Sequence, residues 1–273
     1  MENENILDSP AGVAPALQCY QLSDGRWKEA KVLVPEEMAL TIYINGRELV
    51  TILCTPAKLN CLVTGFLFSE GLISSTSEIV SMRVCEDESL ADVCLSRSEI
   101  ALSERRILTS GCGGGVSFTE EVITIESELT VSPSQILNLM NRLLKQAELY
   151  NLSGGIHTSA LCNNDDILVI AEDIGRHNTL DKIQGECLFR KISTSGKILL
   201  TTGRLSSEML RKAAQMQVPV IASLTSPTER AISIAHKAGI TLIGYTRGKR
   251  LSLYSCSDRM KSETDGSPVK IQS

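Results

Sequence analysis

The chain contains 273 residues, of which 42% are hydrophobic and 22% are charged, with a net charge of −5. This composition is typical of a globular protein, and the length suffices for one large domain or two small ones around a buried core. No apolar run reaches the ~18 residues of a membrane span, and the first ten residues are too polar for a signal peptide. We therefore expect a cytoplasmic protein that does not associate with membranes.

Charge and aromatic content also narrow the possible partners. The chain is acidic and only 4% aromatic, which argues against binding to nucleic acid. Between residues 204 and 250, however, eight basic residues stand against two acidic ones. This local excess fits either an anionic small ligand or the solvated surface of helices.

The nine cysteines are not spaced like a metal site or a disulfide framework. Their number is odd, and no two of them form a C-x-x-C pair. Structural zinc and iron–sulfur sites commonly use such close pairs, so we expect no structural metal. Most of the cysteines should be small buried hydrophobic residues.

The N-terminal part is predicted to be rich in strands. Asn45-Gly46 lies between two alternating segments, a pattern typical of a hairpin turn. The expected elements are an extended arm over residues 1–35, strands over 38–44 and 47–54, a helix from Pro56 to Phe68, a strand over 91–96 and a loop over 103–117. We assign residues 1–130 to this N-terminal β-rich region.

The C-terminal part alternates between apolar strands and helices. The expected strands are 158–162, 167–171, 198–202, 218–223 and 241–246, and the expected helices are 134–150, 177–190, 206–216 and 228–238. Strands separated by helices pair in parallel through right-handed crossovers. We therefore predict an α/β core over residues 131–256 with a mixed, largely parallel sheet, followed by a frayed polar tail over 257–273.

Three polar motifs follow predicted strands of this core. They are EDIGRHN at 172–178, TTGRLSSE at 201–208 and YTRGKR at 245–250. Ligands of α/β sheets bind beyond the carboxyl ends of the strands, where these motifs lie. In the second motif the guanidinium of Arg204 can bind phosphate, and Ser206 or Ser207 can cap the next helix. Together the motifs suggest a site for a phosphorylated, anionic cofactor.

The histidines admit more than one interpretation. Asp173 and His177 could supply a general base or a helix start that binds phosphate, or Asp173 could only cap the next helix. His157 follows two glycines at the start of a strand, and a histidine in such a place is more often structural than catalytic. No serine elbow and no Ser–His–Asp order support hydrolase chemistry.

Cys112 lies in the segment TSGCGGG at 109–115, which shows no hydrophobic periodicity and is predicted to be an exposed loop. Successive backbone N–H groups of such a loop can favour the thiolate, and Arg105 and Arg106 lie close by in the sequence. A thiolate on an open loop suits attack on another sulfur, or the carriage of sulfur as a persulfide. The alternative is a flexible hinge with an incidental cysteine.

Six segments, taken in order along the chain, resemble one known family. They are TSGCGG at 109–114, GGIHTSAL at 154–161, EDIGRHNTLDKIQG at 172–185, TTGRLSSEM at 201–209, PVIASLTSPTERAI at 219–232 and GITLIGYTRGKRLSLY at 239–254. With these segments the chain resembles the formate dehydrogenase accessory sulfurtransferases, the FdhD family. For the structure, the resemblance implies a cytidine deaminase-like layered core and a homodimer.

The resemblance also implies a function. Members of the family accept sulfur as a persulfide from a cysteine desulfurase and deliver it to the molybdenum bis(molybdopterin guanine dinucleotide) cofactor, their bound substrate, for formate dehydrogenase. Cys112 matches the persulfide cysteine of the family. The cofactor-binding segment is matched by Tyr245, Thr246, Arg247, Gly248, Lys249 and Arg250. We add Arg204 to these cofactor-binding residues because its guanidinium can neutralise phosphate charge.

Two departures from the family's pattern leave alternatives open. The loop usually reads C-G-x-C-G, whereas this chain has Gly115 in place of the second cysteine. Transfer through Cys112 alone remains chemically sufficient, since an acceptor can attack the outer sulfur of a persulfide directly, and Cys162 or Cys187 could replace the missing thiol.

The zinc signature of the deaminases is absent, so deamination has no support. The protein could instead be a chaperone that delivers the molybdenum cofactor without sulfur transfer, or a plain nucleotide-binding module.

Overall fold

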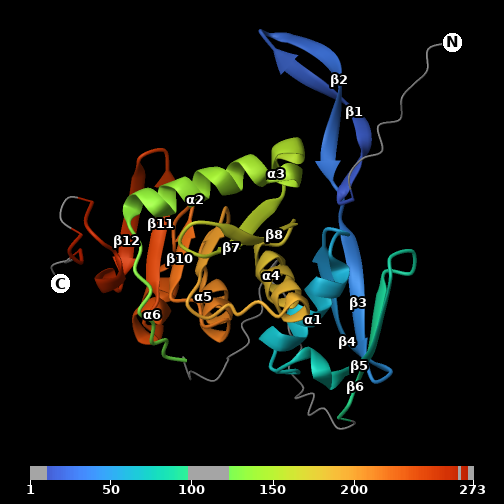
Figure 1. Cartoon of the computed structure of the whole chain (residues 1–273). Coiled ribbons are helices and arrows are strands. Elements are labelled where there is room, and N and C mark those ends of the chain that lie inside the picture. Colours follow the sequence, from blue (N-terminus) through green and yellow to red (C-terminus); the bar gives the residue numbers. More distant parts are fainter. Residues whose placement is uncertain (1–10, 98–122, 264–265, 270–273) are drawn as a thin grey trace.

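The structure is a computed structural model that describes residues 11–97, 123–263 and 266–269. Figure 1 shows its three sheets: a two-stranded arm, a four-stranded sheet with one helix, and a six-stranded sheet flanked by helices. Within the described residues, every helix is too short or too polar to cross a membrane.

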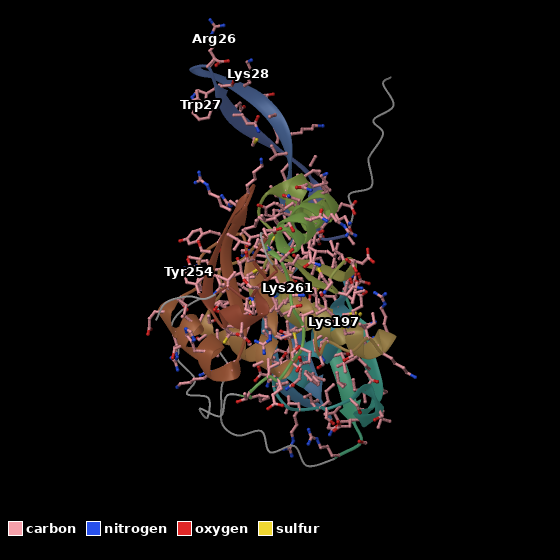
Figure 2. The ribbon with its side chains drawn as sticks, turned by 60° about the vertical axis from the view of Figure 1, so that its left-hand side comes forward. Arg26, Trp27, Lys28, Lys197, Tyr254 and Lys261 are labelled. Atoms are coloured by element: carbon pink, nitrogen blue, oxygen red, sulfur yellow. The ribbon has the colours of Figure 1, made fainter. Side chains whose placement is uncertain are left out.

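The arm is a long antiparallel hairpin that projects from the body of the molecule (Figures 1 and 2). Its strands are β1 (Val13–Ser23) and β2 (Arg26–Pro35). They are joined at Asp24 and Gly25, whose φ values of +52° and +73° are those of a tight hairpin turn. Near the tip of the arm, Trp27 is 68% exposed and Tyr20 is 64% exposed. The expected arm is therefore present over residues 13–35, and it is a paired ribbon.

The small sheet has the order β4-β3-β6-β5 and packs against α1. Its elements are β3 (Met38–Ile44), β4 (Arg47–Cys54), α1 (Leu59–Ser69), the 3-10 helix η1 (Thr76–Glu78), β5 (Ile79–Cys85) and β6 (Leu90–Leu95). The predicted hairpin is confirmed, and Leu40 and Ile42 of β3 are buried against Phe66 of the helix. The helix begins at Leu59 rather than Pro56, because Lys58 has a left-handed φ of +53° that a right-handed helix cannot contain.

The large sheet has the order β12-β11-β10-β9-β7-β8. Its strands are β7 (His157–Cys162), β8 (Ile167–Asp173), β9 (Ile198–Thr201), β10 (Val220–Ser223), β11 (Thr241–Arg247) and β12 (Arg250–Ser255). β9, β10 and β11 are parallel, and β8 shares their direction because β7 is antiparallel to both β8 and β9. β7 and β12 run the other way, since short turns connect them to β8 and β11. The prediction of a mixed sheet is confirmed, although only two of its five strand pairs, β9–β10 and β10–β11, are parallel. The cytidine deaminase-like layering stays a prediction.

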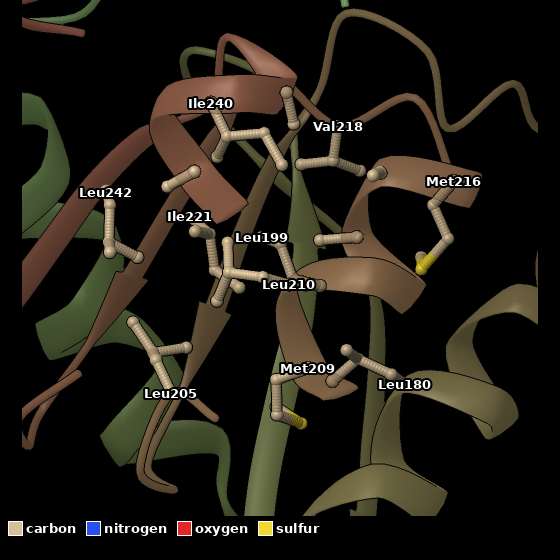
Figure 3. Packing of buried hydrophobic residues seen from close by; sticks show 14 of the residues in the cluster. Leu180, Leu199, Leu205, Met209, Leu210, Met216, Val218, Ile221, Ile240 and Leu242 are labelled. Atoms are coloured by element: carbon tan, nitrogen blue, oxygen red, sulfur yellow. The ribbon is translucent and has the colours of Figure 1, made fainter. Parts of the chain in front are cut away.

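Helices cover both faces of the large sheet. They are α2 (Pro133–Gln146), α3 (Glu148–Ser153), α4 (Arg176–Arg190), α5 (Ser207–Gln215) and α6 (Glu229–Ala238). On one face Leu199, Ile221 and Leu242 are buried against residues of α4, α5 and α6, as the close view in Figure 3 shows around Leu210. On the other face Leu200 belongs to a second buried cluster that includes α2. Because neighbouring strand residues point to opposite sides, one short strand such as β9 supplies both clusters.

The helix expected over residues 134–150 is in fact two helices. The chain breaks at Ala147, whose ψ is +84°, between α2 and α3. The carboxylate of Glu172 on β8 accepts hydrogen bonds from the backbone N–H groups of Leu149 (2.9 Å) and Tyr150 (3.0 Å). Oxygens that accept from free N–H groups in this way stabilise a helix start, so the break depends on a contact between distant parts of the chain.

The two sheets are connected where α1 packs against α4. A Cβ added at Gly65 would lie 1.8 Å from the carbonyl oxygen of Asp181, and one added at Gly185 would lie 1.9 Å from that of Cys61. Glycine is required at both positions because any side chain would separate the helices. This close approach holds the small sheet against α4, the helix that begins at the candidate site described below.

The C-terminal tail is more ordered than expected. Residues 257–259 form the 3-10 helix η2 (Ser257–Arg259), and Arg259 and Met260 are buried. The guanidinium of Arg259 donates a hydrogen bond to the carbonyl of Gly239 (2.7 Å), and the backbone N–H of Lys261 donates to Val131 (2.8 Å). The expectation of fraying is therefore wrong for residues 257–261, because the Arg259 side chain and the backbone of Lys261 are held by backbone groups of the core.

Candidate functional site

The carboxyl ends of β8, β9, β10 and β11 lie at the same end of the large sheet, which we call the site edge. His157 at the start of β7 lies opposite Asp173 at the end of β8. Further along the same edge, the backbone N–H of Tyr245 on β11 donates to the carbonyl of Thr225, just after β10 (3.0 Å). The three polar motifs that follow predicted strands therefore lie on one edge, as the shared direction of these strands requires.

Asp173 is fully buried, and its carboxylate is engaged in structural contacts. Its Oδ1 accepts hydrogen bonds from the backbone of Gly175 (2.8 Å) and from the side chain of Asn178 (2.8 Å). Its Oδ2 accepts from the backbone of Thr55 (3.1 Å), in the small-sheet region. Of the alternatives open for Asp173, the structure therefore favours the turn that leads into α4 over the general base.

His177 lies beneath the site surface and is only 4% exposed. Its Nε2 lies 3.1 Å from Oγ of Ser206 and 3.4 Å from Oε2 of Glu208. Burial, reinforced by the charge of Arg176, lowers the pKa of His177 to about 3. The ring is therefore neutral near pH 7, and it orients the start of α5, where Ser206 accepts from the backbone of Met209 (3.4 Å) as the predicted helix cap.

Positive charge gathers where the turn after β9 meets the start of α4. A Cβ added at Gly203 would lie 2.9 Å from Cβ of Arg176 and 3.4 Å from Nδ1 of His157. Arg204 follows Gly203 directly and is exposed. Burial lowers the pKa of Arg176, and the charge of Arg204 lowers it further. Burial also lowers the pKa of His157, and the positive charge of Arg176 lowers it further. The side chains of His157, Arg176 and Arg204 are therefore close enough to interact electrostatically.

The segment over residues 245–250 forms the hairpin between β11 and β12. Tyr245 has a φ of +51°, and its side chain is 51% exposed. Thr246 is buried, and its Oγ1 has no hydrogen-bond partner within the part of the chain that the structure describes. The tip consists of Arg247, Gly248, Lys249 and Arg250, all exposed. The structure thus places this segment and Arg204 on the same edge, with β10 between their strands.

Cys112 and its loop lie outside the described residues. Of the two cysteines considered as replacements for the missing loop thiol, Cys162 and Cys187 are both buried, and burial raises the pKa of each to about 12. A buried thiol with such a pKa carries almost no thiolate near neutral pH, so neither is suited to accept sulfur. Cys94 on β6 is exposed but lies in the small sheet.

Arg176 is the site residue that the sequence reasoning did not single out. It is the first residue of α4, and the first turn of that helix contains no acidic residue. Helices favour negative rather than positive side chains at this end. An arginine at the start of a predicted helix was therefore a usable signal, but only the turn at Gly203 shows that Arg204 lies nearby.

Residues 35–261 match the model of the FdhD/NarQ family. The chain is 38% identical over 234 residues to a protein of Staphylococcus haemolyticus named sulfur carrier protein FdhD, covering 83% of this chain and 89% of that protein. It is 34% identical over 257 residues to the protein of the same name from Bacillus licheniformis, covering 91% and 98%.

A solved structure is also similar across most of the chain. The crystal structure of a protein from Desulfotalea psychrophila, described as a formate dehydrogenase accessory protein, matches with a TM-score of 0.75 at 26% sequence identity. The match covers 90% of this chain and 98% of the other.

Proposed function

Because the chain belongs to the FdhD/NarQ family, we propose that it is a sulfur carrier in the maturation of formate dehydrogenase. The observation that carries the proposal is the extent of the match, which includes relatives named sulfur carrier protein over 83% and 91% of the chain. The activity is a sulfurtransferase reaction through a cysteine persulfide.

Cys112 is the proposed carrier of sulfur. Its thiolate attacks the outer sulfur of a persulfide on a cysteine desulfurase, so that a new S–S bond forms while the S–S bond of the desulfurase breaks and its thiolate leaves. The outer sulfur then passes to the molybdenum bis(molybdopterin guanine dinucleotide) cofactor, and a thiol reductant supplies the two electrons that convert sulfane sulfur to sulfide. The burial of Cys162 and Cys187 supports transfer through Cys112 alone, since neither buried thiol is suited to replace the missing second cysteine of the loop.

The cofactor is the substrate of this reaction, and the exposed cations of the sheet edge are the proposed residues that bind it. Arg204 and the segment from Tyr245 through Thr246, Arg247, Gly248 and Lys249 to Arg250 lie on that edge. Each charge-assisted hydrogen bond between such a side chain and a phosphate contributes about 1.5–3 kcal/mol. Tyr245, half exposed beside these cations, offers a ring on which a guanine base can stack.

Intact mass spectrometry tests the proposed carrier. After incubation with a cysteine desulfurase and cysteine, the wild-type protein should gain the mass of one sulfur atom, and Cys112→Ala should gain none. Cys94→Ala is the matched control, because it removes an exposed thiol of the small sheet and should leave the gain unchanged. A gain that persists in Cys112→Ala would exclude Cys112 as the carrier.

A chaperone that delivers the cofactor without sulfur transfer is the second candidate function, favoured by Gly115 in place of the family's second loop cysteine. The same mass measurement separates the two functions. If a desulfurase that loads another acceptor adds no sulfur to this protein, while the protein still binds the cofactor, the chaperone function is correct.

The proposed partners are a cysteine desulfurase, formate dehydrogenase and a second copy of this chain, all in the cytoplasm. Light scattering coupled to gel filtration tests the homodimer directly, since it should yield twice the mass of one chain. A single-chain mass over the working concentration range would contradict it.

A further inference from the structure

Arg176 occupies an electrically unfavourable position. It begins α4, whose N-terminal backbone carries a partial positive charge, and Gly175 at the cap position offers no side chain to accept from the free N–H groups. Arg190 at the opposite end of the same helix has the favourable arrangement, because it pairs with Glu186 (2.7 Å) and lies at the negative end. The two arginines of one helix thus differ in how far their charge is balanced.

The surroundings of Arg176 add positive charge. The turn at Gly203 lies against Arg176 and His157. A Cβ added at Gly203 would lie 2.9 Å from Cβ of Arg176 and 3.4 Å from Nδ1 of His157, and Arg204 is the next residue of this turn. The Nε of Arg176 is buried and has no hydrogen-bond partner among the described residues. Since a buried donor without a partner is unfavourable, an acceptor bound at this position would stabilise the arrangement.

Nearby acidic groups balance this charge only in part. Glu208 raises the pKa of Arg176, but its carboxylate faces His177 (3.4 Å), and burial raises its own pKa. Asp173 lies opposite His157 in the sheet, but its ion pair with buried Lys182 (2.6 Å) occupies that carboxylate. The balance of described charges at this corner of the edge is therefore positive.

We propose that Arg176, Arg204 and His157 form a binding position for a phosphate-type oxyanion, at the start of α4. Arg176 supplies the planar donor set that matches two phosphate oxygens, and the free N–H groups of the first turn of α4 are further donors. Arg204, which is exposed, supplies a second guanidinium from the solvent side, and neutral His157 donates one ring N–H.

The identity of the ligand rests on the proposed function: the oxyanion is one phosphate of the guanine dinucleotide. The binding position thus adds a phosphate site to the cofactor-binding residues proposed above. β9 and β11 are separated by two strand spacings, about 10 Å, because β10 lies between them. A phosphate held after β9 therefore leaves room for the rest of the nucleotide to reach Tyr245 and the cationic hairpin. The oxyanion position itself depends only on the contacts described above.

Calorimetric titration with inorganic pyrophosphate, and separately with guanosine diphosphate, tests the proposal on the full chain. Arg176→Gln should bind pyrophosphate at least about 10-fold more weakly than wild type, whereas Arg190→Gln, the control on the same helix, should bind like wild type. Arg204→Gln, an exposed substitution that cannot disturb the core, should weaken binding in the same direction. Thermal unfolding verifies that each variant is folded, and pyrophosphate should raise the melting temperature of wild type but not of Arg176→Gln.

Each other outcome has a defined meaning. Equal binding by wild type and Arg176→Gln, or equal loss in Arg176→Gln and Arg190→Gln, overturns the site. A loss for pyrophosphate with unchanged guanosine diphosphate binding overturns the assignment to the nucleotide and leaves a site for free oxyanions. Sulfur loading of Cys112 by the desulfurase requires no nucleotide, so failure of the carrier function would appear in that mass measurement and not in these titrations.

Discussion

Asp173 and Lys182 form an ion pair of 2.6 Å in which both side chains are fully buried. The Nζ of Lys182 also donates to the backbone carbonyls of Thr55 and Glu172 (3.1 Å each). Thr55 follows the small sheet, whereas Glu172 and Asp173 end β8, so this one ammonium group connects the two sheets beneath the candidate site. Its role is to hold the site edge in place.

Lys182→Met is therefore expected to destabilise the protein strongly. It leaves the Asp173 carboxylate buried without its counter-charge, and breaking a buried pair from one side costs about 3–5 kcal/mol. Chemical denaturation measures this as a lower free energy of unfolding. Lys145→Gln, on the exposed surface of α2, is the control and should stay within about 0.5 kcal/mol of wild type. A loss below about 1 kcal/mol in Lys182→Met would contradict the buried pair.

The approach of α1 to α4 predicts an unusual sensitivity to a single methyl group. Gly65→Ala places a Cβ against the backbone of Asp181, which cannot rotate away as a side chain could, so the helices must separate. We expect a loss of about 1–3 kcal/mol or more in the free energy of unfolding. Asn60→Ala, an exposed position on the same helix, introduces the same residue without a clash and should be nearly neutral. Similar stabilities for the two variants would show that the helices are farther apart.

The cysteines should differ widely in reactivity toward alkylating reagents. Cys54, Cys162 and Cys187 are buried, and burial raises the pKa of each to about 12. Near pH 8 only about one such thiol in 10,000 is a thiolate, and the reagent cannot reach it in the folded state. Cys94 is exposed and should be modified before these three buried cysteines. Peptide mass spectrometry after brief iodoacetamide treatment checks the order, and rapid native labelling of Cys162 would contradict the burial.

His177 should make the stability depend on pH. Its folded pKa of about 3 lies below the ordinary value of 6.5, because burial disfavours the charged ring. The stability contributed by this group is therefore fully present above pH 6.5 and is lost as the pH falls from 6.5 toward 3. Wild type should lose up to about 1.4 kcal/mol per pH unit more than His177→Gln over this window.

The measured quantity must be the difference between wild type and variant. Burial raises the pKa values of Glu70 and Glu208, and carboxyl groups with raised pKa values stabilise the fold as the pH falls, which opposes the effect of His177. Denaturation at several pH values gives the two slopes. His236→Gln, at an exposed position near the end of α6, is the control and should retain the wild-type slope.

The arm can be followed by fluorescence, because Trp27 is the only tryptophan of the chain. Its side chain is 68% exposed near the tip of the hairpin (Figure 2), so its emission should be that of an indole in water and acrylamide should quench it efficiently. A blue-shifted emission that resists quenching in dilute solution would show that the arm is covered, by the body or by a second copy.

Much of the core could be predicted because its determinants are local. The alternating residues on either side of Asn45-Gly46 determine a hairpin, and Ser206 caps the start of α5 as its sequence context predicts. Apolar strands between helices predicted the parallel part of the large sheet, and that shared direction already implied that the polar motifs lie on one edge. These features depend on neighbouring residues, whose influence does not require the rest of the fold.

Other elements were missed because their signals are weak or distant. β5 is an edge strand of partly buried residues without strong alternation, and β12 follows the cationic turn that drew attention as a binding motif. The end of α2 at Ala147 depends on Glu172, which is far along the chain. Pairing partners of this kind are supplied by the tertiary structure and not by local propensity.

The candidate site shows the same division. The sequence by itself indicated which residues have the chemistry for the proposed function: a thiol among glycines at Cys112, and cations at Arg204 and over 245–250. Only the tertiary structure decided that Asp173 is a structural carboxylate and that Arg176 shares a corner with Arg204. The physical reason is that residue type fixes what a group can donate, accept or attack, whereas burial, pairing and like charge nearby depend on segments that meet only when the chain is folded.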